Sequence, residues 1–126
     1  MFSYYANSGS VSSGSYLTFN IPMVNNDGNF DGTKFKCPFE RNVFYDFSFA
    51  GSGYSNEITV IAVKKNGIDQ LKFFFRDSNV NDYHLISFSW KMELAFEDEV
   101  SLYVERGKIV SGSEANRIFN GIHIIQ

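Results

Sequence analysis

Four side chains with hard oxygen atoms lie close together in one polar segment. They are Asp77, Asn79, Asn81 and Asp82. Carboxylate and amide oxygens are the ligands that Ca²⁺ prefers, and a calcium ion takes about six to eight of them. The sequence therefore makes calcium a candidate ligand of this segment, with an ordinary solvated loop as the alternative.

Two tyrosines and two arginines stand in or beside polar segments of the chain. They are Tyr54, Tyr83, Arg106 and Arg117. Aromatic rings stack on the faces of sugars, and Arg, Asn and Asp side chains bind hydroxyl or carboxylate groups. We expect these four residues, with the oxygen-rich segment 77–82, to form a site for a glycan or an acidic ligand. For each residue alone, ordinary packing at a surface or a strand edge is the alternative.

The other reactive residue types form no catalytic or zinc-binding set. His84 and His123 are the only histidines, and Cys37 is the only cysteine, so neither a zinc site nor an intrachain disulfide is expected. Serines are numerous, but no Ser/His/Asp arrangement emerges from their positions. We therefore expect no enzymatic activity and no required cofactor.

Two acidic segments have simpler interpretations. Residues 27–32 begin like a helix-loop-helix calcium loop, but the twelfth position is Pro38 instead of a bidentate Glu. This segment is expected to be a turn. The carboxylates of residues 97–99 lie in a hairpin turn, where solvent keeps them ionised.

Length and charge limit the classes of protein to consider. The 126 residues are enough for one domain, 1–126, and the net charge of −3 comes with no basic cluster beyond Lys64-Lys65. Nucleic-acid binding needs a concentrated basic face, so it is not expected. No apolar run approaches the roughly 20 residues of a membrane span, so membrane insertion is not expected either.

Alternation with a period of two indicates strands throughout the chain. Tyr45, Phe47 and Phe49 share one face of a strand, and a second strand places Phe88, Trp90, Met92 and Leu94 opposite Ser87, Ser89, Lys91 and Glu93. Sustained helical periodicity is absent from the sequence. The expected strands are 2–6, 16–19, 29–37, 43–50, 57–65, 71–75, 84–94, 100–104 and 118–125, with a Ser/Gly-rich linker at 7–15.

The expected loops fall into two groups. If consecutive strands are antiparallel, the segments 51–56, 77–82 and 105–116 share one end of the domain. The segments 66–70 and 95–98 then share the other end, where Asn66-Gly67 is a strong hairpin signal. The first group is longer and more polar, and function is usually carried by such loops.

The chain resembles the globular head domain of complement C1q, in the superfamily that includes tumour necrosis factor. The resemblance covers nearly the whole chain and depends on the order of several short motifs. In most of them the residues agree with the family pattern, although Glu97 stands where the family has Gly. The motifs are Phe2, then Phe19, Asn25 and Phe30, then Phe35-Lys36-Cys37-Pro38, Tyr45-Asp46-Phe47-Ser48-Phe49, Lys65-Asn66-Gly67, Leu94 through Asp98 to Val100, and Phe119-Asn120-Gly121-Ile122.

The resemblance implies an all-β, ten-strand jelly-roll β-sandwich that assembles as a compact homotrimer and is secreted. It also implies that subunit pairing buries aromatic and aliphatic residues, which offers one use for the 14 Phe and 7 Tyr of the chain. The family's collagen-like stalk is not found in these residues. The chain is therefore expected to be a head alone or an invertebrate-type, stalkless member.

The expected function is lectin-like pattern recognition in innate immunity, with glycans or other repeated microbial or host surface ligands as partners. Three weak sites on one trimer would act together by avidity. Two alternatives stay open at this point. One is a receptor-binding or adhesion ligand of the tumour-necrosis type, and the other is a structural trimerisation cap of a fibre or matrix protein.

Overall fold

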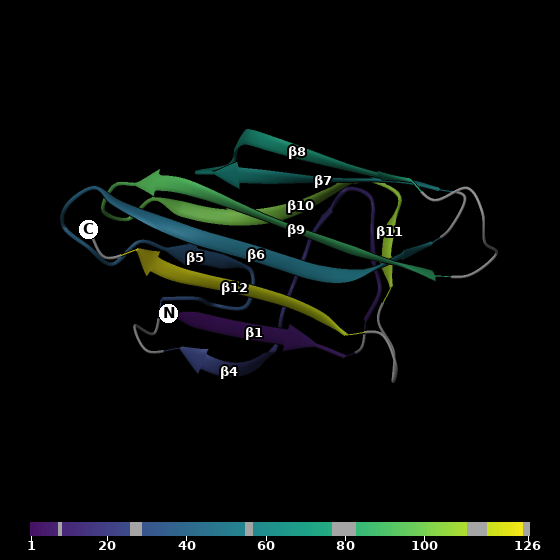
Figure 1. Ribbon diagram of the computed structural model, residues 1–126, viewed down its shortest axis with the longest axis horizontal. Coiled ribbons are helices and arrows are strands. Elements are labelled where there is room, and N and C mark those ends of the chain that lie inside the picture. The colour runs from purple at the N-terminus through teal and green to yellow at the C-terminus, as the bar shows by residue number, and fades with distance from the viewer. Residues whose placement is uncertain (8, 26–28, 55–56, 77–82, 111–115, 125–126) are drawn as a thin grey trace.

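The structure is a computed structural model that describes residues 1–7, 9–25, 29–54, 57–76, 83–110 and 116–124, with only the backbone of Tyr54 and Tyr83. Its strands form two antiparallel sheets packed face to face, and the long strands run along the long axis of the domain (Figure 1). The strands are β1 (Phe2–Ala6), β2 (Val11–Ser12), β3 (Ser15–Tyr16), β4 (Ile21–Asn25), β5 (Lys34–Lys36), β6 (Val43–Tyr54), β7 (Ile58–Lys65), β8 (Ile68–Arg76), β9 (Tyr83–Leu94), β10 (Glu99–Arg106), β11 (Lys108–Val110) and β12 (Arg117–Ile124).

The first sheet has the order β2-β11-β6-β12-β1-β4, with β9 on the other side of β6. The second sheet has the order β3-β10-β7-β8, with β5 also paired to β10. The chain crosses between the sheets from β2 to β3 and again from β10 to β11. If each of these pairs is counted as one bent strand, ten strands remain, and the all-β jelly roll predicted from the sequence is confirmed.

Aromatic rings from both sheets fill the space between them. Tyr45, Phe47 and Phe49 of β6 are buried, as their alternation predicts, and Phe47 stacks on Trp90 of β9 with ring centroids 5.2 Å apart. Seven of the 14 phenylalanines are buried within this single chain. Packing within one chain therefore accounts for much of the high aromatic content. The resemblance had offered subunit contacts as one explanation for it.

Several predicted boundaries are wrong. The predicted loop 51–56 begins too early because β6 continues to Tyr54, and the loop 105–116 contains the end of β10 and all of β11. The linker 7–15 contains β2 and the first residue of β3. In each case the residues pair with a neighbouring strand that lies far away in the sequence, a contact that local composition does not reveal.

The two groups of loops lie at opposite ends of the sandwich, as predicted. Tyr54 pairs with Tyr83 and Ile58 pairs with Arg76, so β6, β8 and β10 all finish at the same end, which we call the loop end. The other end carries the β7–β8 turn and the β9–β10 turn, and we call it the hairpin end.

Candidate functional site

The loop end contains those residues predicted to bind a ligand that the structure describes, which are Tyr54, Tyr83, Arg106 and Arg117. Asp77, Asn79, Asn81 and Asp82 lie outside the described residues. Tyr54 and Tyr83 lie opposite each other at the ends of β6 and β9, with their side chains not described. Calcium binding by the segment 77–82 and ligand binding by Tyr54 and Tyr83 therefore stay predictions.

Arg117 lies inside the domain rather than on the surface of the loop end. Its side chain is only 2% exposed. Its guanidinium donates hydrogen bonds to the carbonyl oxygens of Thr18 (2.8 Å) and Gly9 (2.6 Å) and lies over the ring of Phe19. Burial lowers the pKa of this guanidinium. In the described structure Arg117 joins the segment 9–18 to β12 and does not face a ligand-binding surface.

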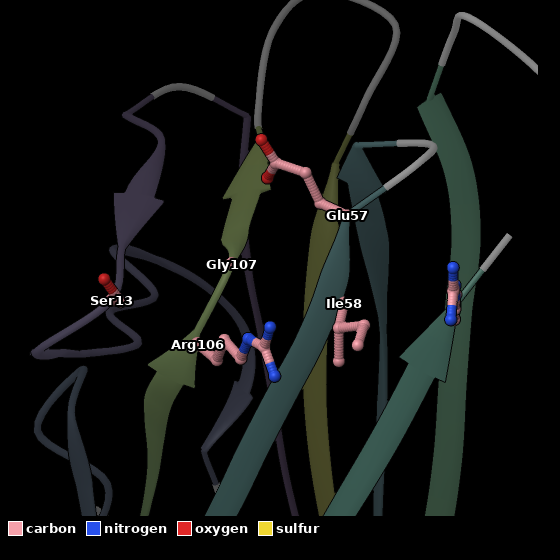
Figure 2. Close-up of a pocket in the computed structure, with 6 residues that line it drawn as sticks. Ser13, Glu57, Ile58, Arg106 and Gly107 are labelled. Atoms are coloured by element: carbon pink, nitrogen blue, oxygen red, sulfur yellow. The ribbon is translucent and has the colours of Figure 1, made fainter. Parts of the chain in front are cut away.

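Arg106 does line a pocket, which we call the arginine pocket. It has a volume of about 560 Å³, within the range of small-molecule sites, and is open to solvent. Figure 2 shows the Arg106 side chain extending from β10 toward Ile58 of β7. The lining residues are Ser13, Glu57, Ile58, Arg76, Arg106 and Gly107.

The strand register places both arginines on the outer face of the second sheet. Residues directly opposite each other in an antiparallel pair share a face. Ile58 is opposite Arg76, and Val60 is opposite Arg106, so strand β7 lies between the two arginines.

A β-bulge decides the direction of Arg106. Val104 is buried in the core, and strict alternation would send Arg106 to the same inward face. The register shifts between Val104 and Arg106, so one extra residue, Glu105, is inserted there. A bulge of this kind re-aims the following side chain, and here it brings Arg106 to the outer face.

Sequence reasoning missed two residues of this surface, Arg76 and Phe74. Both lie on β8, two positions apart, and Phe74 is opposite Val60 in the same row as Arg106. The Phe74 ring is 69% exposed, which is unusual for a phenylalanine. The alternation of residues 72, 74 and 76 on one strand face was the available signal.

The charged side chains on the outer face of the second sheet differ in whether they form ion pairs. Lys72 forms ion pairs with Glu105 (3.0 Å) and Asp69 (3.6 Å), and Lys64 pairs with Asp69. The hydrogen bond from Lys72 to Glu105 raises the pKa of the lysine. Within the described part of the chain, neither Arg76 nor Arg106 has an ion-pair partner.

Gly107 shapes the floor of the pocket where β10 leaves the second sheet. Its φ is +79°, a conformation that favours glycine. A Cβ atom here would lie 2.7 Å from the carbonyl oxygen of Ile58 and 2.8 Å from Oγ1 of Thr59. Only glycine lets the chain turn this closely against β7, and the turn gives the pocket its edge.

The remaining candidates for metal or thiol chemistry are structural. Among the described residues, no cluster of three His, Cys, Asp or Glu side chains could hold a metal. Asp31 accepts hydrogen bonds from the backbone N–H groups of Thr33 and Lys34, which is the turn predicted for that region. Burial raises the pKa of the Cys37 thiol, so the thiol is unreactive at neutral pH.

The hairpin end is held by hydrogen bonds between its two turns. Asn66 donates to Asp98 Oδ1 (2.9 Å) and accepts from the backbone N–H of Glu99, while Asp98 Oδ2 accepts from the N–H of Ala95 (2.8 Å). Partial burial of Asp98 acts to raise its pKa. The bonds from Asn66 and Ala95 and the charge of Lys65 outweigh that effect, so the pKa is lowered.

The class of protein defined so far is an all-β jelly-roll domain with a pocket lined by two arginines on one face. A family model described as "C1q domain" matches residues 2–124. The chain therefore belongs to the C1q domain family. A comparison with curated protein sequences finds no match.

Among solved structures, the globular domain of the zebrafish complement 1qA protein is similar over the whole domain. It has a TM-score of 0.77 and 19% sequence identity, covering 99% of this chain and 97% of that one. This likeness confirms the fold predicted from the sequence motifs.

Two further structures are less similar. The C-terminal domain of EclA, a sugar-binding protein, has a TM-score of 0.47 and 13% identity over 93% of this chain and 79% of that chain. A Podospora anserina GH26-CBM35 β-(1,4)-mannanase has a TM-score of 0.48 and 12% identity over 98% of this chain and 28% of that chain. Nothing below depends on them.

In the described part of the chain, no helix is both long and apolar enough to cross a lipid bilayer.

Proposed function

We propose that this C1q domain is a secreted, trimeric recognition head that binds glycans or other repeated surface ligands in innate immunity. The observation that carries the proposal is the arginine pocket. It combines two cationic side chains, a hydroxyl group and a carboxylate on one face at the loop end. This mixture of directional polar groups suits a ligand rich in hydroxyl groups.

Trimerisation is the second part of the proposal. On the outer face of the first sheet, Phe44, Leu85 and Ile122 are exposed apolar side chains. Between them runs a polar row in which Ser3 donates to Asn120, and Asn120 donates to Ser48 (3.2 Å). Covering this face with a second copy of the chain would remove the apolar groups from water.

A trimer matters for function because a single shallow pocket binds one sugar weakly. Three pockets held on one assembly raise the effective concentration for the second and third contacts, so avidity can exceed single-site affinity by roughly 10²–10⁴. The repeated ligands of a cell surface meet this requirement. A single soluble sugar does not.

Size-exclusion chromatography with light scattering tests the assembly. We expect about 43 kDa, three times the 14.4 kDa of one chain, and the measurement is repeated with a calcium chelator. Loss of the trimer on chelation would implicate the oxygen-rich segment 77–82 in calcium binding. A stable monomer in both conditions would contradict the avidity argument.

A glycan array and a bacterial-surface binding assay, with calcium present, test recognition. Binding that is lost when the trimer is dissociated supports the proposal. If neither assay shows binding, the lectin-like function is wrong. A protein receptor of the tumour-necrosis type or a structural trimerisation role would then become the leading function.

A further inference from the structure

We propose that the arginine pocket selects sugars that carry a carboxylate group, with Arg76 and Arg106 holding the carboxylate and Phe74 stacking on the sugar ring. The inference rests on the proposed glycan-binding function and adds the charge of the ligand and the residues that recognise it. Uronic acids and nonulosonic acids such as N-acetylneuraminic acid both have this chemistry.

The first step of the argument is charge. The lysines of the same sheet face, Lys64 and Lys72, are occupied by Asp69 and Glu105. Within the described residues, Arg76 and Arg106 have no such partner, although they line one pocket. A guanidinium presents N–H groups in a planar fork that matches the two oxygens of a carboxylate.

The second step is spacing. Arg76 and Arg106 lie on the two strands that flank β7, opposite residues two positions apart. Two strand spacings of about 5 Å and an offset of about 7 Å along the strand separate their backbones by roughly 12 Å. The β7 residues opposite them, Ile58 and Val60, are apolar and offer neither guanidinium a partner. A carboxylate above Ile58 would lie within reach of both flexible side chains.

The third step concerns the rim of the pocket. Figure 2 shows the carboxylate of Glu57 and the hydroxyl of Ser13 at separate positions around Arg106 and Ile58. Both groups can accept hydrogen bonds from sugar hydroxyls. The negative charge of Glu57 also disfavours ligands with many anionic groups, such as polyphosphates. The pocket therefore fits a singly charged, hydroxyl-rich ligand.

The fourth step is the exposed ring of Phe74. It lies two residues before Arg76 on the same strand face, about 7 Å away along β8. An exposed phenylalanine is costly to keep in water and offers an apolar face. A sugar whose carboxylate lies between the arginines can place the apolar face of its ring on Phe74.

The test is isothermal titration calorimetry of the whole domain with matched sugars. The methyl glycosides of glucuronic acid and glucose differ only in the carboxylate, so this pair tests recognition of uronic acids. The methyl glycoside of N-acetylneuraminic acid tests recognition of nonulosonic acids. We expect each acidic sugar that fits to bind about tenfold or more tightly than the neutral one, and to lose affinity as salt increases. A preference for one of the two acidic sugars identifies which class of sugar acid the pocket recognises.

Variants assign the residues. R76Q and R106Q should each weaken binding of the acidic sugar by about tenfold and leave the neutral sugar nearly unchanged, because each removes a charge-assisted hydrogen bond. R41Q removes the same charge from an exposed arginine that does not line the pocket, and it should have no effect. F74A should weaken both sugars equally, which separates stacking from charge recognition.

The possible failures are distinguishable. If sugars bind but the acidic and neutral partners have equal affinity, or if R76Q and R106Q bind like the wild type, this inference is overturned and the proposed function stands. If neither the array nor the titrations detect any sugar, both fail together. A circular-dichroism melt of each variant excludes unfolding as the cause of a loss.

Discussion

At the hairpin end, Asn66, Asp98 and Lys65 bind one another and the backbone of both turns. At the loop end, Arg76 and Arg106 face solvent across Ile58 with no ion-pair partner among the described residues. Both ends join strands of the same two sheets. The sheet topology alone therefore does not explain why the charged side chains are paired at the hairpin end, while the two arginines at the loop end have no ion-pair partner among the described residues. Polar side chains at the hairpin end stabilise turns, whereas no ion pair among the described residues occupies Arg76 or Arg106 in the arginine pocket.

Three arginines at the loop end refine this comparison. Arg117 is buried and donates to two backbone carbonyls, while Arg76 and Arg106 are exposed. The same residue type therefore has two roles within one end of the domain. Substitutions should separate stability from binding there, and should affect stability alone at the hairpin end.

The largest effect is expected from Arg117→Ala. The substitution leaves the carbonyl oxygens of Gly9 and Thr18 without these donors and removes packing over Phe19, so we expect a loss of about 2–4 kcal/mol in the free energy of unfolding. Urea denaturation measures it. A change below about 0.5 kcal/mol, the range of ordinary surface substitutions, would show that Arg117 is not structural.

Asp98→Asn is expected to cost about 1–2 kcal/mol at pH 7, because it weakens the bonds from Asn66 and Ala95. The pKa of Asp98 is lower in the folded state than the value of about 3.9 for an unfolded Asp. Its contribution to stability is therefore complete above that value and is lost as the pH falls through the folded pKa. Urea titrations from pH 7 to pH 3 should show the difference between wild type and variant shrinking. A constant difference would contradict this linkage.

Glu97→Gly should stabilise the hairpin end by about 1 kcal/mol. Glu97 has a φ of +67°, a left-handed conformation that costs a residue with a Cβ roughly 1–2 kcal/mol. This is the position where the family pattern has Gly. Part of the gain is offset because glycine makes the unfolded chain more flexible. A lower melting temperature for the variant would indicate that the Glu97 side chain contributes to stability.

The smallest effect on stability is expected from Arg76→Gln and Arg106→Gln. Both side chains are exposed, and we expect changes within about 0.5 kcal/mol even where binding falls tenfold. Thermal melts of both variants provide the measurement. A loss above about 1 kcal/mol would mean that these arginines hold the loop end together, and the contrast with Arg117 would fail.

Local patterns predicted much of the fold because period-two alternation directly reports which face of a strand is buried. The inward rows of β6 and β9 and the Asn66-Gly67 turn are confirmed, with φ of 55° and 79° in that turn. The short strands β2 and β11 were missed because their partners are distant in sequence. Arg76 and Phe74 were missed because no local pattern shows that β8 and β10 flank the same strand, β7.

The sequence by itself determined the all-β class, the inward faces of the long strands and the grouping of loops at two ends. These follow from alternation and turn residues, which act over a few neighbouring positions. Only the tertiary structure decided that Arg117 is buried, that a bulge turns Arg106 outward, and that β7 brings Arg76 and Arg106 to one pocket. The physical reason is that strand neighbours and register depend on contacts between residues that lie far apart in the chain.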